Sequence, residues 1–179
     1  MKNESLTLIS YLEKVWPILE YSTKEVMDKI TGKPNLNSES KKHIWYLYRQ
    51  SFYGFASVLP DIKYYYSNAA NLIFIKDSKG TILEGRSLSS IKWTDQPIFD
   101  PKRGKLILEH MYTGTMFRIA VWKLFNEGRL SIKEVAKLIS TEYKVCWITK
   151  DENEKLHKTK REENLFKYYK KNEIVIDNI

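Results

Sequence analysis

The chain has 179 residues, enough for one ordinary domain with a hydrophobic core, and its 42% hydrophobic content argues against intrinsic disorder over most of its length. A net charge of +8 favours a polyanionic partner such as nucleic acid. The one cysteine, Cys146, excludes an internal disulfide and a zinc finger built from thiolates, and its apolar neighbours indicate a buried side chain.

The N-terminal segment contains a short apolar run with charged residues close behind it. That run is too short and too charged for a signal peptide, and no apolar stretch in the chain approaches the ~20 residues of a membrane span. We therefore expect a cytoplasmic protein without a membrane partner.

Apolar residues recur at helical spacing through the first sixty residues. They predict a first helix capped by Ser5, bent or restarted at Pro17, and a second helix that begins at Asn37 or Ser38 and ends before Pro60. A further short helix is expected over residues 64–70. Together these segments predict a helical N-terminal layer over residues 1–70.

The rest of the chain predicts a small mixed sheet with further helices. Residues 72–75 and 81–83 flank a turn that contains Asp77 and Gly80, which indicates a β-hairpin over residues 72–83. Residues 145–148 predict a buried strand. The other expected elements are a strand or helix entry at 105–108, helices near 116–125, 131–139, 149–158 and 163–170, and a strand at 174–176. The fold class is α+β, in one domain over residues 1–179.

Residues 86–104 contain Pro97, Pro101 and Gly104 and predict an ordered loop. A loop of that length in a compact domain is often functional. The basic residues that we expect to contact nucleic acid are Lys102, Arg103, Lys105 and Arg118.

An acidic residue and a histidine, Glu109 and His110, follow the apolar segment after this loop. The pair resembles the first motif of HNH-type endonucleases over about ten residues. The resemblance implies that His110 deprotonates water while Glu109, with Asp100 in the loop, holds Mg²⁺ or another divalent metal. The later Asn and His of that family have no well-spaced counterparts here.

A second set of residues resembles the site of restriction-type nucleases with the PD-(D/E)XK motif. Asp77 or Asp61 would be the first carboxylate, and Glu84-Gly85-Arg86 stands where that family has Glu-x-Lys. The resemblance implies a metal held by the two carboxylates. Arg86 departs from the pattern, because an arginine cannot lose its proton and act as a base.

A binding module without catalysis is the alternative. Residues 130–139 resemble the first helix of a helix-turn-helix, although residues 145–148 predict a strand where a recognition helix should follow. The sequence thus predicts a nucleic-acid-binding protein, with DNA favoured over RNA and a metal-dependent endonuclease as its most specific form. A DNA-binding or protein-interaction module is the other interpretation.

Overall fold

The computed structural model describes residues 2–59, 64–157 and 164–177. The chain divides into two compact units, residues 1–62 with 113–143 and residues 63–112 with 144–179. The prediction of one domain over residues 1–179 stays a prediction, and each unit is described by itself.

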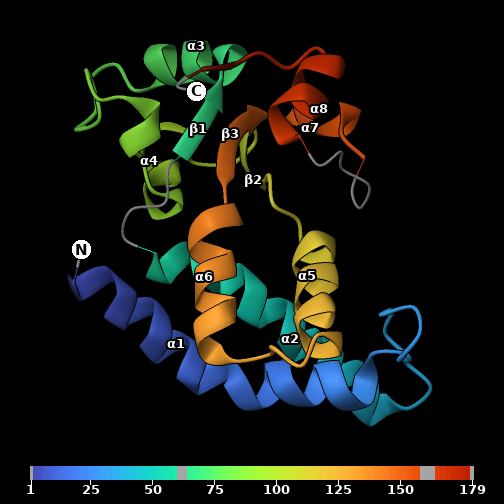
Figure 1. Ribbon diagram of the computed structural model, residues 1–179. Coiled ribbons are helices and arrows are strands. Elements are labelled where there is room, and N and C mark those ends of the chain that lie inside the picture. Colours follow the sequence, from blue (N-terminus) through green and yellow to red (C-terminus); the bar gives the residue numbers. More distant parts are fainter. Residues whose placement is uncertain (1, 60–63, 158–163, 178–179) are drawn as a thin grey trace. The chain divides into compact units, whose positions relative to one another are not determined.

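The first unit is helical. It contains α1 (Lys2–Tyr21), the π-helical turn η1 (Ser22–Val26), α2 (Glu39–Val58), α5 (Gly114–Asn126) and α6 (Ile132–Glu142) (Figure 1). Helix α1 packs against α2 and α6, and α2 packs against α5. Both predicted helices are therefore confirmed, but the predicted cap at Ser5 is wrong, because α1 begins at Lys2 and continues through Pro17. Ser38 caps α2 by accepting the backbone N–H of Lys41.

Aromatic side chains fill the core of this unit. Phe52 and Phe55 of α2 pack against Phe117 of α5 with ring centroids 5.3 and 5.5 Å apart, and both also contact Tyr143. These rings are buried because helical spacing places them on the inner face of α2. Much of the aromatic content of the sequence therefore serves packing.

The second unit is built on a four-stranded mixed sheet with the order β2-β3-β1-β4. The strands are β1 (Tyr64–Ser67), β2 (Leu106–His110), β3 (Val145–Thr149) and β4 (Ile176–Asp177). β1 runs parallel to β3, whereas β2 and β4 pair antiparallel to their neighbours. The predicted strand at residues 145–148 is confirmed, and the segment at 105–108 forms a strand.

The two faces of the sheet are covered by different parts of the unit. Trp147 of β3 and Leu106 of β2 belong to a buried cluster with Phe74 of α3 (Asn68–Asp77) and Phe99 of α4 (Gln96–Phe99). On the other face, Tyr65 of β1 contacts Phe166 of α8 (Leu165–Lys171), with ring centroids 5.2 Å apart. Helix α7 (Lys150–Lys155) also lies there: its Glu152 carboxylate accepts the hydroxyl of Ser67 in β1 at 2.6 Å.

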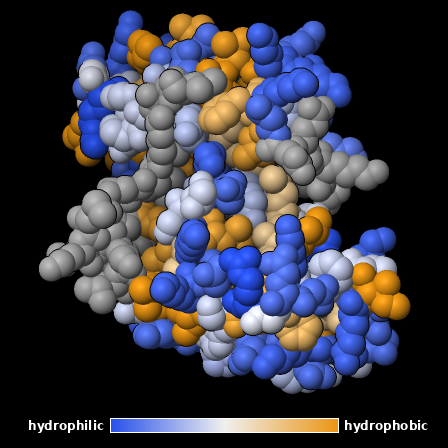
Figure 2. Space-filling model, in the orientation of Figure 1, coloured by the Kyte–Doolittle hydropathy of each residue, from blue (hydrophilic) through white to orange (hydrophobic). Residues whose placement is uncertain are grey.

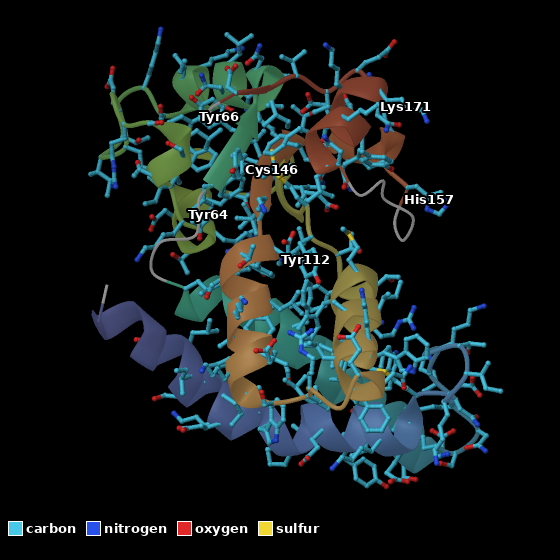
Figure 3. All side chains as sticks on the ribbon, viewed as in Figure 1. Tyr64, Tyr66, Tyr112, Cys146, His157 and Lys171 are labelled. Atoms are coloured by element: carbon cyan, nitrogen blue, oxygen red, sulfur yellow. The ribbon has the colours of Figure 1, made fainter. Side chains whose placement is uncertain are left out.

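Cys146 lies inside this sheet. It stands on β3 next to β1, whose Tyr64 and Tyr66 are labelled with it in Figure 3. Burial raises the pKa of the Cys146 thiol, and the carboxylates of Glu152 and Glu109 raise it further. The thiol is fully buried, as expected from its apolar neighbours in the sequence.

The predicted hairpin over residues 72–83 is wrong, and so is the predicted helix over residues 64–70. Residues 64–67 form β1, and Ser67 then caps α3 by accepting the backbone N–H of Ala70. Leu72 on α3 is 69% exposed, and apolar residues reach the surface over this helix (Figure 2). The turn that we assigned to a hairpin instead follows the end of α3, where Gly80 has a φ of 74°.

Helices α6 and α7 begin at the caps that the sequence indicates. Thr149 and Glu152 form a reciprocal capping box at the start of α7, and Ser131 accepts the backbone N–H of Glu134 at the start of α6. Within residues 2–59, 64–157 and 164–177, none of the helices combines the length and the apolar character needed to cross a membrane.

We predict that Gly32→Ala destabilises the first unit more than Gly128→Ala does. Both glycines have a positive φ, 60° and 67°, but a Cβ at Gly32 would lie 2.7 Å from the ring of Trp122, whereas the space at Gly128 is open. The backbone strain costs about 1 kcal/mol at either position, and the steric conflict should add roughly 1–3 kcal/mol at Gly32. Urea unfolding of both variants measures the difference; equal losses would contradict the packing described here.

Candidate nucleic-acid interface

The segment between α3 and β2 folds into three short helical turns. They are η2 (Leu88–Ser90), η3 (Trp93–Asp95) and α4. The indole N–H of Trp147 donates to the Ile91 carbonyl oxygen at 3.1 Å, and Phe99 packs edge-on against Phe74 with centroids 5.0 Å apart. These contacts fix the segment on the sheet, which confirms the ordered loop expected over residues 86–104.

The carboxylate of Asp100 organises the end of this segment. It accepts the backbone N–H groups of Gly104, Lys105 and Leu106 at 2.9, 3.0 and 3.2 Å. The side-chain amide of Gln96 donates to the same carboxylate at 3.1 Å and to the Leu106 carbonyl oxygen at 2.8 Å. We call residues 100–106, closed by these hydrogen bonds, the Asp100 loop.

Asp100 is 3% exposed. Burial acts to raise the pKa of its carboxyl group, but the backbone N–H groups and the Gln96 amide outweigh it and hold the pKa of Asp100 below its usual value. The carboxylate is therefore ionised and already engaged by four donors. Asp100 therefore holds the loop together as a hydrogen-bond acceptor. Its role as a metal ligand, expected from the sequence, stays a prediction.

The Asp100 loop carries Arg103 over the ring of Trp93. The guanidinium carbon lies 3.6 Å from the ring centroid, the geometry of a cation–π contact. Arg103 adopts a left-handed φ of 46°, which costs a non-glycine residue about 1 kcal/mol, and its N–H donates to the Asp100 carbonyl oxygen at 2.8 Å. Trp93 remains 47% exposed in this position.

The segment between the end of α3 and the Asp100 loop also carries exposed basic side chains. Those that are exposed on residues 79–102 are Lys79, Arg86, Lys92 and Lys102. We call these four residues, with Arg103 and Trp93, the basic loop surface. Four acidic residues stand in the same stretch of chain. Asp100 is buried, Asp77 accepts from Lys105 at 2.6 Å, Glu84 is exposed and accepts the backbone N–H of Gly80, and Asp95 is half-buried on η3.

The four basic residues expected from the sequence thus have different roles. Lys102 and Arg103 belong to the basic loop surface. Lys105 is exposed and forms an ion pair with Asp77. Arg118 lies in the other unit, on α5, where its guanidinium donates to the carbonyl oxygen of Gly32 and is partly buried. That contact gives Arg118 a structural role.

Glu109 and His110 are neighbours on β2, so their side chains point to opposite faces of the sheet. Glu109 is paired with Cys146 and His110 with Val145. Burial lowers the pKa of His110 from 6.5 to about 4, so the imidazole is neutral near pH 7. The adjacency that resembles an HNH motif does not bring the two groups to one face, and their catalytic and metal-binding roles stay predictions.

Of the restriction-type residues, Asp77 ends α3, and Glu84 and Arg86 lie on the turn that follows it. Glu84 accepts the backbone N–H of Gly80 at 2.8 Å, and Asp77 is held by Lys105. Arg86 is exposed on the same turn, and Asp61 lies outside the described residues. Across the part of the chain that the structure describes, no group of three or more His, Cys, Asp or Glu residues is placed to hold a metal ion.

Comparison of the chain with protein-family models, with curated proteins and with solved structures finds no match. The function must therefore be inferred from the site itself.

Sequence reasoning missed Trp93. Its position within the ordered loop, directly after Lys92, is the signal that could have found it, since an aromatic next to a basic residue is typical of nucleic-acid contacts. Its partner Arg103 stands ten residues further along the chain, and their contact depends on the Asp100 loop.

The first unit offers a groove with basic side chains for comparison. A groove of about 360 Å³ lies between α5 and α6, lined by Lys123, Arg129 and Lys137 together with Glu127, Glu134 and Glu142. Arg129 pairs with Glu127 and Glu134 at 3.0 and 2.6 Å. Helix α6 is followed by strand β3, so the predicted helix-turn-helix that would begin with residues 130–139 is wrong.

We predict that Asp100→Ala destabilises the second unit by on the order of 3 kcal/mol, because it leaves the buried N–H of Leu106 and the partly buried N–H groups of Gly104 and Lys105 without an acceptor. Glu154→Ala, an exposed change on α7 of the same unit, should cost less than about 0.5 kcal/mol. Chemical unfolding of both variants measures the losses. Similar values would show that the Asp100 hydrogen bonds contribute little.

The depressed pKa of His110 predicts acid sensitivity. The unfolded chain binds a proton at His110 near pH 6.5, whereas the folded chain binds it only near pH 4. The stability that neutral His110 contributes to the fold is therefore fully present above pH 6.5 and is lost as the pH falls towards 4. The loss is at most about 3 kcal/mol. Comparing the pH dependence of the unfolding free energy in wild type and His110→Gln measures it; parallel curves through this window would contradict the assignment.

Proposed function

We propose that the protein binds nucleic acid through the basic loop surface. The observation that carries this proposal is the Arg103–Trp93 pair, with a guanidinium 3.6 Å from the centroid of a half-exposed indole ring. Arginine and lysine side chains bind phosphates, and aromatic rings stack on bases, so the combination suits a polynucleotide. The net charge of +8 adds a long-range attraction for the same partner.

The distribution of acidic groups supports this location. Near the basic loop surface, the carboxylates of Asp77 and Asp100 are satisfied within the fold by Lys105 and by backbone N–H groups. In the groove between α5 and α6, by contrast, glutamates stand among the basic residues and pair with Arg129. The first stretch sets five basic residues against the exposed Glu84 and the half-buried Asp95, whereas the groove is lined by three basic and three acidic side chains.

We predict that replacing Lys79, Lys92 and Lys102 together by Ala weakens binding to labelled DNA and reduces its salt dependence. Each phosphate contact that is lost should lower the slope of log K against log salt by about 0.9 on duplex DNA. The matched control replaces Lys123, Lys133 and Lys137, which removes the same charge from exposed positions of the first unit. Fluorescence anisotropy at several salt concentrations, on DNA and on RNA, measures both effects.

Equal weakening by the two triple variants would show that only net charge matters and would contradict the proposed surface. Absence of salt-dependent binding to DNA and RNA by the wild type would contradict nucleic-acid binding altogether. Incubation of the same substrates with Mg²⁺ or Mn²⁺, and with EDTA, tests the predicted endonuclease: cleavage that disappears in His110→Ala would add a catalytic role to the binding proposed here.

A further inference from the structure

The Trp93 ring is held in place before any ligand arrives. One side of it is in contact with the Arg103 guanidinium, whose backbone is fixed by the hydrogen bond from its N–H to the Asp100 carbonyl oxygen at 2.8 Å. The backbone just before Trp93 is bound to the sheet as well, because the carbonyl oxygen of Ile91 accepts the indole N–H of Trp147. A ring that is covered on one face and carried by a backbone bound to the sheet loses little conformational entropy when it binds.

An indole that is 47% exposed on a rigid segment is a stacking platform. Its electron-rich face is polarised by the arginine, and nucleobases stack on such rings irrespective of their sequence. In a duplex the faces of the bases are already stacked on one another, so a ring of this kind gains contact only with an unpaired base. The flanking Lys92 and Lys102 are exposed and suited to the phosphates on either side of that base.

We propose that Trp93 and Arg103 form a binding site for an unpaired nucleobase, so that the basic loop surface prefers single-stranded over duplex nucleic acid. This inference rests on the proposed function. Trp93 stacks on the base, Arg103 positions the ring, and the Asp100 loop positions Arg103. The left-handed φ of 46° at Arg103 fits this assignment, because a glycine would relieve the strain but would remove the guanidinium.

The test compares the affinities of wild type, Trp93→Ala and Trp93→Phe for a labelled single strand and for a duplex of the same length. Trp93→Ala should weaken single-strand binding roughly 5- to 150-fold, the range measured for loss of one base–aromatic stack, and should change duplex binding less than about 2-fold. Trp93→Phe retains a ring and should recover most of the single-strand affinity. Thermal unfolding of each variant confirms that the fold is retained.

Tryptophan fluorescence gives a second readout. Stacking on a base quenches an indole, so wild type should lose emission on addition of the single strand, and Trp93→Phe should lack that part of the change while it still binds. Unchanged single-strand affinity in Trp93→Ala, or equal losses on single strand and duplex, would overturn the stacking site. Either result would leave the proposed nucleic-acid binding intact, provided that the lysine variants show salt-dependent binding. If the wild type shows no salt-dependent binding, both proposals are contradicted.

Discussion

The buried carboxylate of Asp100 is the constraint on which the candidate interface depends. Its hydrogen bonds reach back to Gln96 of α4 and forward to Leu106 of β2, so one side chain fixes the entry to the strand and the loop before it. The same closure sets Arg103 over Trp93. Because unsatisfied backbone groups are costly when buried, the loop has few alternatives to this conformation. A protein scaffold of this kind presents charge and aromatic surface without a large ordering cost on binding.

The parts of the fold that were predicted correctly from the sequence rest on local interactions. Ser38, Thr149 and Glu152 indicate where helices begin, because a capping side chain forms a hydrogen bond with a backbone group only three residues away. The strand at residues 145–148 follows from its continuous apolar run. The predicted hairpin over residues 72–83 is wrong because a short apolar run is compatible with both a strand and a helix. The structure has a helix there, which Ser67 caps. The parallel pairing of β1 with β3 joins residues some eighty positions apart, which no local pattern reveals.

The candidate site was partly visible in the sequence. Loop length and prolines indicated residues 86–104, and Lys102 and Arg103 were among the expected contacts. Arg118 donates to Gly32, a contact between residues 86 positions apart that no local pattern reveals, and its contact with nucleic acid stays a prediction. Glu109 and His110 looked like a catalytic pair only as neighbours in the chain, and strand alternation directs them to opposite faces. The Trp93–Arg103 contact needs a left-handed residue in the Asp100 loop, and spacing alone does not predict one.

Nucleic-acid binding at the basic loop surface is tested most directly by following backbone and indole N–H resonances of the isotope-labelled protein while a short single-stranded oligonucleotide is added. Binding at the basic loop surface predicts that the largest shifts fall on residues 92–105 and on the Trp93 indole N–H, with small changes on α5 and α6. Shifts concentrated in the groove between α5 and α6, or no shifts at oligonucleotide concentrations that saturate a typical binder, would contradict it.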